Sequence, residues 1–310
     1  MRGMQRNAGI LIGLVVVIVA IIIGFVLFSS SGTPPASSPS PEASASAEPS
    51  TSLNAELLDR RWTVLYVGTD LNDTREADGV GPNTDALMLA SLSADQSQLT
   101  LVSLPRDTVD VPLADGSTWD GKVNSLYNDR GIDELVGAMS TLYGVPIDAY
   151  LVLDMDDFAR LVEAAGGVEV SPPAPLVDPI VNLDLAAGDQ ELDGQQTLGY
   201  VRTRVDQDYG RMGRQQEVSV ALVRKLVDSE TDLDLREVID SLESLETDLP
   251  LEDLPTLLEL ARRATEAEVH NLLIRPPLIT FEGDRADGQG YVLEADIEAI
   301  RSEVQGLIGD

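Results

Sequence analysis

The chain has 310 residues and is strongly acidic, with 53 Asp plus Glu against 21 Lys plus Arg and a formal net charge of −32. This charge argues against nucleic acid as a partner, because a phosphate backbone attracts basic surfaces. Cysteine is absent and His270 is the only histidine, which excludes disulfides, thiolate catalysis and zinc–thiolate sites. We expect His270 to have a structural or surface role near the start of a strand.

An apolar run near the N-terminus predicts a membrane anchor. Ala8–Phe28 contains no charged residue, and about 20 helical residues span the hydrocarbon core of a bilayer. Arg2 and Arg6 precede this run, whereas the next basic residue is Arg60. Because basic residues favour the cytoplasmic side, we expect residues 1–7 in the cytoplasm, one transmembrane helix over the apolar run, and the rest of the chain outside the cell membrane.

The segment after the anchor has the composition of a tether. Ser29–Ser52 is rich in Ser, Pro and Ala and has no large apolar residue, so it cannot bury enough surface to offset its ordering entropy. We expect a disordered linker over residues 29–57. The remaining residues, 58–310, are rich in Leu, Val and Ile and predict one extracytoplasmic domain with a sizeable core.

The domain alternates between predicted strands and helices. In chain order we expect a strand at Trp62–Thr69, an antiparallel pair at Ala86–Leu92 and Leu99–Leu104, a helix at Ile132–Tyr143, a strand at Ala149–Leu153, a helix at Asp156–Ala165, a strand at Val168–Val170, and helices at Arg211–Val227, Leu235–Leu245, Leu251–Ala264 and Glu294–Ile308. This order predicts an α/β fold with a central mixed β-sheet flanked by helices on both faces.

A concentration of arginines is unusual in so acidic a chain. The segment YVRTRVDQDYGRMGRQQ contains Arg202, Arg204, Arg211 and Arg214. Guanidinium groups are planar, stay charged and bind phosphate oxygens in pairs, so the cluster predicts an anion site. We expect the side chains of Arg106, Arg202, Arg204 and Arg214 to face a solvated cleft. The alternative is a set of surface ion pairs with Asp206 and Asp208.

Charged residues also lie at the ends of the predicted strands. Asp70 follows the first strand, Asp85 precedes the second, and Arg106 follows the third. Ligands of α/β proteins bind outside the carboxyl ends of strands, and Mg²⁺ in phosphate sites takes one or two carboxylates plus phosphate oxygens. Asp70 and Asp85 therefore predict a site for Mg²⁺ (or Mn²⁺). Lys122 in GKVNSLY is a further candidate, although each residue alone has an ordinary explanation in a turn.

Eight segments between about Val64 and Val223 carry a resemblance. They are VLYVGTD, TDALMLASL, LTLVSLPRDT, GKVNSLY, YGVPIDAYLVLD, LVEAAGGVEV, LDGQQTLGYVRTR and DYGRMGRQQEV, in this order. Together they resemble the LytR-CpsA-Psr family of membrane-anchored cell-wall enzymes. The later segment TDLPLEDL is similar to another part of the same family domain.

The resemblance implies a phosphotransferase that moves a glycopolymer from a polyprenyl-pyrophosphate carrier to the muramic acid 6-hydroxyl of peptidoglycan and releases polyprenyl phosphate. It also implies an apolar pocket for the prenyl chain, arginines around the pyrophosphate, and a metal bound by Asp70 and Asp85. The catalytic and pyrophosphate-binding residues carried over by motif are Arg106, Arg202, Arg204, Arg214 and Gln215, with a looser match at Lys122 and Arg211.

Two positions depart from the family pattern. Asn83 stands where an arginine is frequent, and Ala86 stands where a threonine is frequent, which puts one guanidinium contact to the phosphates in doubt. Two other functions remain open. One is a polyprenyl-pyrophosphate phosphatase that uses water, and the other is a non-catalytic, membrane-anchored regulator that senses lipid-linked precursors. The retained aspartates and arginines favour catalysis over sensing, whereas they do not distinguish water from a sugar hydroxyl.

Overall fold

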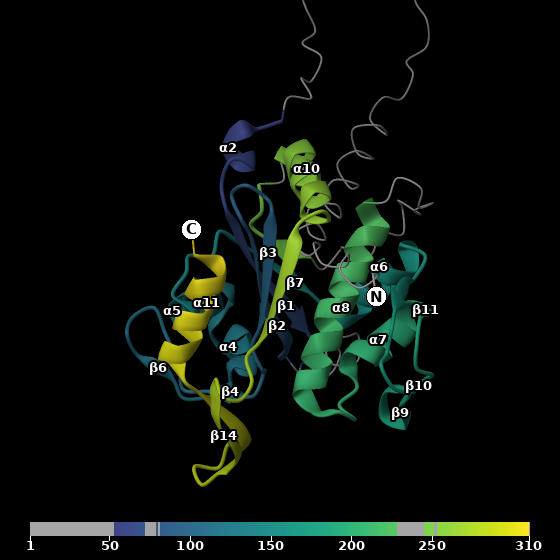
Figure 1. The fold of residues 1–310 in the computed structure, drawn as a ribbon. Helices are drawn as coiled ribbons and strands as arrows, with labels where there is room; N and C mark the ends of the chain where they lie inside the picture. Colours follow the sequence, from purple (N-terminus) through teal and green to yellow (C-terminus); the bar gives the residue numbers. More distant parts are fainter. Residues whose placement is uncertain (1–52, 72–78, 80, 228–244, 251–252, 310) are drawn as a thin grey trace, which may run out of the picture.

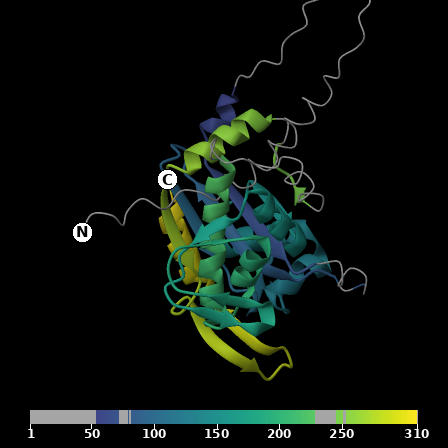
Figure 2. The ribbon, with the colours of Figure 1, turned by 90° about the vertical axis from the view of Figure 1, so that its right-hand side faces the viewer.

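A mixed β-sheet forms the centre of the protein. The computed structural model describes residues 53–71, 79, 81–227, 245–250 and 253–309, and two views show their arrangement (Figures 1 and 2). The six strands of the sheet, in spatial order, are β12 (Glu246–Thr247), β7 (Ala149–Leu153), β1 (Trp62–Thr69), β2 (Thr84–Leu92), β3 (Gln98–Ser103) and β13 (Glu268–Leu273). Neighbours are antiparallel except β1 with β7 and β3 with β13, which are parallel.

Both faces of the sheet are buried, because successive side chains of a strand enter opposite hydrophobic cores. In β2, Met88 and Ala90 belong to one core, whereas Leu87 and Leu89 belong to the other. Continuous apolar strands are what a sheet covered on both faces requires. The sequence therefore specifies helices on both sides.

Each core is completed by its own set of helices, seen on the two sides of the sheet in Figure 1. The first core includes residues from α2 (Ala55–Leu58), α6 (Met155–Ala164), α7 (Gly194–Arg202), α8 (Gln207–Val227) and α10 (Leu254–Ala264). The second includes residues from α4 (Val123–Arg130), α5 (Ile132–Tyr143) and α11 (Ile297–Ile308).

Smaller β-structures surround the central sheet. The antiparallel hairpin of β14 (Ile279–Arg285) and β15 (Gly290–Ala295) pairs through β15 with β4 (Thr108–Val109). Three further pairs are β8 (Val168–Val170) with β11 (Gln190–Leu192), β9 (Leu176–Asp178) with β10 (Leu183–Leu185), and β5 (Val111–Pro112) with β6 (Thr118–Trp119). In both views the β14–β15 hairpin projects at the end of the domain opposite α2 and α10 (Figures 1 and 2).

Most predicted elements are confirmed, with corrections at some ends. The helix expected from Arg211 begins earlier, at Gln207, and the helix expected from Glu294 begins at Ile297 because Glu294 belongs to β15. Folded structure also starts within the expected linker, where Asn54 caps the short helix α2. The helix expected over Leu235–Leu245 falls almost entirely outside the described residues.

The predicted membrane anchor, Ala8–Phe28, and the tether Ser29–Ser52 also lie outside the described residues. Within the part of the chain that is described, none of the helices combines the length and the apolar character needed to cross a bilayer.

Candidate functional site

The site lies at one edge of the central sheet. The carboxyl ends of β1, β3, β7 and β13 meet the amino end of β2 there, because β2 runs antiparallel to β1 and β3. Thr69 pairs with Thr84 and Gly68 pairs with Ala86, so Asp85 is an extra residue in β2. Such a β-bulge redirects a side chain and is common beside functional sites. The bulge accounts for the way the Asp85 carboxylate is presented at this edge.

Asp70 and Asp85 have different partners. Asp70 accepts hydrogen bonds from the backbone N–H of Asn83 at 2.7 Å and from its Nδ2 at 3.2 Å, and its own N–H donates to the Asn83 carbonyl at 2.9 Å. Asn83, which occupies the position of the expected arginine, thus joins the two ends of the segment between β1 and β2. Asp85 instead forms an ion pair with Arg106.

Arg106 is held in a network of carboxylates. Its Nε lies 3.7 Å from Asp107 Oδ2, and Lys122 Nζ lies 3.1 Å from Asp107 Oδ1. Burial opposes the charge of Arg106, but the attraction of Asp85, Asp107 and Asp208 outweighs it and raises the pKa above its usual value. The Arg106 Nε is buried without a hydrogen-bond partner. The guanidinium is therefore fixed in position and charged, with a donor still available.

The arginine cluster is organised around Asp208 in the first turns of α8. Asp208 Oδ1 lies 3.3 Å from Arg204 Nε and 3.3 Å from Arg211 Nη2. Arg211 is only 2% exposed, and its Nε has no hydrogen-bond partner. Burial, the largest effect, lowers the pKa of Arg211 to about 10. A buried donor without a partner is costly, so this guanidinium is suited to receive an anionic ligand.

Arg214 has a different position from the one expected. It is 6% exposed, and it donates to the carbonyls of Tyr200 at 2.8 Å and Thr203 at 2.5 Å and to Asp206 Oδ2 at 2.6 Å. These bonds connect the start of α8 to the end of α7. The expectation that Arg106, Arg202, Arg204 and Arg214 face a solvated cleft is therefore wrong for Arg214. The geometry favours Arg214 as a support for the turn that carries the other arginines.

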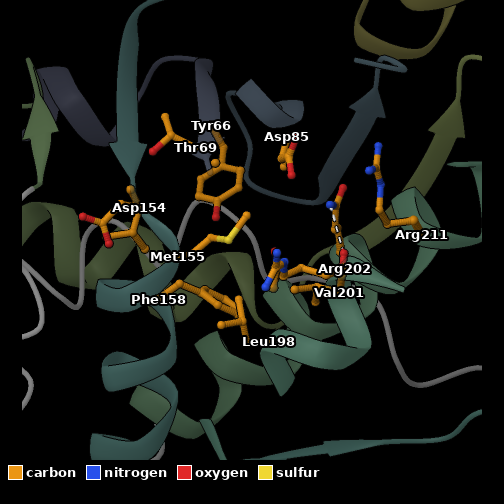
Figure 3. A pocket seen from close by; sticks show the side chains of 15 residues that line it. Tyr66, Thr69, Asp85, Asp154, Met155, Phe158, Leu198, Val201, Arg202 and Arg211 are labelled. Atoms are coloured by element: carbon orange, nitrogen blue, oxygen red, sulfur yellow. Dashed lines mark hydrogen bonds between the residues drawn. The ribbon is translucent and has the colours of Figure 1, made fainter. Parts of the chain in front are cut away.

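A pocket opens between the sheet edge and helices α6, α7 and α8. Its apolar wall contains Tyr66, Leu153, Met155, Phe158, Leu198 and Val201. Its polar end contains Asp85, Arg202, Arg211 and Gln215. In Figure 3, Met155, Phe158 and Leu198 gather on one side of the pocket, while Asp85 and Arg211 lie toward the other. The pocket thus joins an apolar space to a cationic end.

Arg202 and Tyr66 contribute polar groups to the pocket. Arg202, at the end of α7, has no carboxylate partner among the residues that the structure describes. Tyr66 has its pKa raised by burial, so its hydroxyl remains a neutral hydrogen-bond donor.

The carboxylates of Asp70 and Asp85 are the predicted ligands of a magnesium ion. Within the described residues, no group of three or more His, Asp or Glu side chains could hold a metal ion. Mg²⁺ usually binds through one or two carboxylates and completes its shell with phosphates and water. Asp70 directly follows β1 and Asp85 lies in the neighbouring strand β2, so both carboxylates belong to this sheet edge, where Asn83 and Arg106 are their respective partners.

Two residues of this site were not among those predicted from the sequence, Asp107 and Tyr66. Asp107 pairs with Lys122. The ion pairs of Asp208 with Arg204 and Arg211, and of Asp206 with Arg214, are the alternative that the sequence left open. Tyr66 gave no signal, because an aromatic residue in a buried strand is normally part of a core.

The sequence is similar to a known protein family and to several of its members. The LytR_cpsA_psr family model matches residues 30–304. The probable cell wall biosynthesis protein LcpB of Corynebacterium glutamicum is 40% identical over 148 residues, 47% of this chain and 34% of that protein. TagU of Enterococcus faecalis, a polyisoprenyl-teichoic acid–peptidoglycan teichoic acid transferase, is 30% identical over 198 residues, 62% of this chain and 63% of that protein.

Solved structures share the fold. The crystal structure of TagV from Bacillus subtilis aligns with a TM-score of 0.62 at 23% identity, covering 81% of this chain and 98% of that one. The sequence alignments with LcpB and TagU each span less than two thirds of the relative's length. The family model, in contrast, matches most of the present chain, including every strand and helix that forms the site. The chain therefore belongs to the LytR_cpsA_psr family.

Proposed function

We propose that this protein is a phosphotransferase that moves a glycopolymer from a polyprenyl-pyrophosphate carrier to a hydroxyl of peptidoglycan. The relatives named as teichoic acid transferases support the reaction class. The observation that carries the proposal is the pocket itself, where an apolar wall meets Arg202 and Arg211. A prenyl chain and a pyrophosphate joined in one molecule match these two halves.

The charge of the site supports a pyrophosphate ligand. Arg202 lacks a carboxylate partner in the described part of the chain, and Arg211 keeps an unpartnered Nε in a buried position. In a chain of net charge −32, unmatched guanidinium groups at a pocket are unlike ordinary surface charge. Guanidinium forks bind phosphate oxygens in pairs. The bound diphosphate would then supply the hydrogen-bond acceptors that these arginines lack.

The proposed transfer has one bond-forming and one bond-breaking event. The acceptor hydroxyl oxygen bonds to the sugar-linked phosphorus, and the bond from that phosphorus to the bridging oxygen breaks. Its electron pair stays on the departing polyprenyl phosphate. Asp70 or Asp85, at the sheet edge, takes the hydroxyl proton, while Arg106 and Arg211 stabilise the charge on the transferring phosphoryl group.

Metal and membrane complete the proposal. Asp70 and Asp85 would hold Mg²⁺, which when bound neutralises part of the pyrophosphate charge. A transmembrane helix over Ala8–Phe28 would keep the domain on the outer face of the membrane that contains the lipid donor. Both features rest on the sequence pattern and on the donor set described above.

The test is a turnover assay with the purified full-length chain in lipid nanodiscs. The substrates are a polyprenyl-pyrophosphate-linked saccharide, Mg²⁺ and muramic-acid-containing glycan fragments. Mass spectrometry should detect polyprenyl phosphate and a phosphodiester-linked glycan conjugate in equal amounts. Polyprenyl phosphate with free sugar phosphate and no conjugate would identify a phosphatase instead. Binding of the donor without any turnover would identify a sensor.

A further inference from the structure

The β14–β15 hairpin borders the arginine site, and none of its residues lines the apolar pocket. Leu293 of β15 pairs with Thr108 of β4, and its N–H donates to the carbonyl of Asp107 at 3.1 Å. On the other strand, Glu282 accepts a hydrogen bond from the hydroxyl of Tyr209 in α8. The hairpin is thus fixed at two points, beside Asp107 and beside the residue that follows Asp208.

Tyr291 is the exposed aromatic residue on the site-facing side of this hairpin. It pairs with Asp284 directly across the two strands, so both side chains lie on the same face of the hairpin. Side chains two positions further along either strand lie on this face as well. That face includes Glu282, which contacts Tyr209. The Tyr291 side chain is 48% exposed. Partial burial and then the charges of Glu282, Asp208 and Asp107 raise its pKa.

The geometry of phosphoryl transfer decides what this face can receive. The attacking and leaving oxygens lie roughly in line on opposite sides of the phosphorus. If the leaving polyprenyl phosphate occupies the apolar pocket, the acceptor must approach from the opposite side of the arginines. Arg211 lines the pocket and its Nη2 lies 3.3 Å from Asp208 Oδ1, and the next residue, Tyr209, donates a hydrogen bond to Glu282 of the hairpin. These contacts lead from the pocket, through the arginines, to the hairpin face that carries Tyr291.

We propose that the face of the β14–β15 hairpin that carries Tyr291 and Glu282 is the binding subsite for the acceptor glycan, with a pyranose ring stacked on Tyr291. This inference rests on the proposed transferase function and names the acceptor side of that site. One face of a pyranose is a layer of C–H groups that packs on an aromatic ring, while its rim of hydroxyl groups donates to carboxylates. An aromatic ring beside carboxylates offers both kinds of contact.

The hairpin provides its own matched control. Phe281 is 39% exposed, and its side chain is similar in size to that of Tyr291. It pairs with Glu294 and immediately precedes Glu282 in β14. It therefore lies on the opposite face of the same hairpin. Truncating Phe281 removes a comparable exposed ring without touching the proposed subsite. The Tyr291→Phe variant keeps the ring and removes only the hydroxyl.

The experiment measures binding of a soluble glycan to the full-length chain in nanodiscs. The probe is a tetrasaccharide of β-1,4-linked N-acetylglucosamine, and its Kd is measured by calorimetry, with melting temperatures as a check on folding. We expect Tyr291→Ala to weaken binding at least about tenfold, whereas Tyr291→Phe stays within about threefold of the parent chain and Phe281→Ala binds as the parent does. In the turnover assay, Tyr291→Ala should raise the KM for acceptor.

Three results would overturn the subsite. They are a parent chain that does not bind the probe, a Tyr291→Ala variant that binds it normally, or an equal loss in Phe281→Ala. The proposed transferase function fails separately. A chain that binds the tetrasaccharide through Tyr291 but makes no glycan conjugate from the lipid donor would retain the subsite and lose the transfer reaction.

Discussion

The arginines of this protein differ in what surrounds them, although they lie within a short stretch of sequence. Arg202 lines the pocket without a carboxylate partner in the described part of the chain, and Arg204 is 40% exposed beside Asp208. Arg214, in contrast, is buried and bonded to two backbone carbonyls. The first two are therefore available to a ligand, whereas Arg214 holds the protein together at the site.

Replacing an available arginine by lysine should slow transfer. Lysine keeps the charge but loses the planar fork, so we expect Arg202→Lys or Arg204→Lys to reduce kcat/KM at least about tenfold, or about 1.4 kcal/mol. The melting temperature should stay the same, because neither side chain supports the core. Arg262→Lys is the control, since Arg262 is an exposed helical ion pair with Glu259. Unchanged kcat/KM in both site variants would remove them from the phosphate site.

Arg214→Lys should behave differently. Lysine cannot reach both carbonyls and Asp206 with one ammonium group, so buried acceptors lose their donors. We expect a loss of about 2 kcal/mol or more in the free energy of unfolding, measured by urea denaturation, together with slower transfer. A variant with parental stability and strongly reduced transfer would instead show that Arg214 contacts the substrate.

The two aspartates should also be separable. Asp85→Ala should abolish turnover, with a loss of at least about 100-fold, while the melting temperature changes little, because Asp85 lies in a bulge at the sheet edge. Asp70→Ala should abolish turnover and also lower stability, since it removes both bonds to Asn83. Steady-state kinetics and thermal melts on the same samples measure both effects. Near-parental transfer by either variant would exclude that carboxylate from the reaction.

At the scale of elements, the pattern of apolar residues decided which helices and strands could be predicted from the sequence. β1, β7 and α5 were predicted to the residue. β1 and β7 are apolar runs with a charged residue on each side, whereas α5 has apolar residues at helical spacing between two glycines. α4 was missed because VNSLYNDR is mostly polar and only Val123 and Leu126 are buried. β14 and β15 were missed because their exposed Glu and Asp residues resemble a loop. Pairing with distant β4 stabilises them, and local sequence does not encode it.

One buried contact ties a peripheral strand pair to the helix that carries Arg202. Thr203, at the end of α7, donates to Asp178 Oδ2 of β9 at 2.7 Å. This bond is the largest influence that lowers the pKa of Asp178. A carboxyl group with a lowered pKa in the folded state stabilises the fold at pH values above its unfolded-state pKa of about 3.9. This stabilisation is lost as the pH falls through the folded-state pKa.

Removing that contact should therefore have a pH-dependent effect. We expect Thr203→Val to lower the melting temperature at pH 7 and to lower it less at pH 3, because the parent chain has by then begun to lose the same contribution. Asp178→Asn should show the same trend. Thermal melts between pH 3 and 7 measure it. A constant difference across this range would mean that the bond to ionised Asp178 is not what stabilises the end of α7.

On the scale of the whole molecule, the chain enters at one end of the sheet and the site lies at the other. α2 precedes β1, and β1 leads to Asp70, while both views place the β14–β15 hairpin opposite α2 (Figures 1 and 2). Eight residues of strand separate these ends by about 26 Å. If Ala8–Phe28 anchors the chain, as we propose, a donor in the same membrane reaches the site only when the connection to the anchor is long enough for the domain to turn.

The length of that connection is therefore expected to matter. Residues 29–52 can reach at most about 80 Å when fully extended, and deletion of residues 31–46 leaves less than half of that reach. We expect this deletion to reduce transfer from a membrane-embedded donor at least about tenfold, while a short-chain, water-soluble donor is turned over normally. Equal activity of both chains on the embedded donor would show that the site does not need this reach.

The central claim is that the pocket beside Arg202 and Arg211 binds a polyprenyl pyrophosphate, and native mass spectrometry of the full-length chain in mild detergent tests it most directly. The parent chain, purified from membranes, should carry a polyprenyl phosphate or pyrophosphate mass. Leu198→Trp, which fills the apolar wall, and Arg202→Glu, which reverses the charge, should both lose it, while Arg262→Glu on the exposed face of α10 should retain it. A parent chain without any prenyl lipid, or equal lipid occupancy in Leu198→Trp, would contradict the assignment.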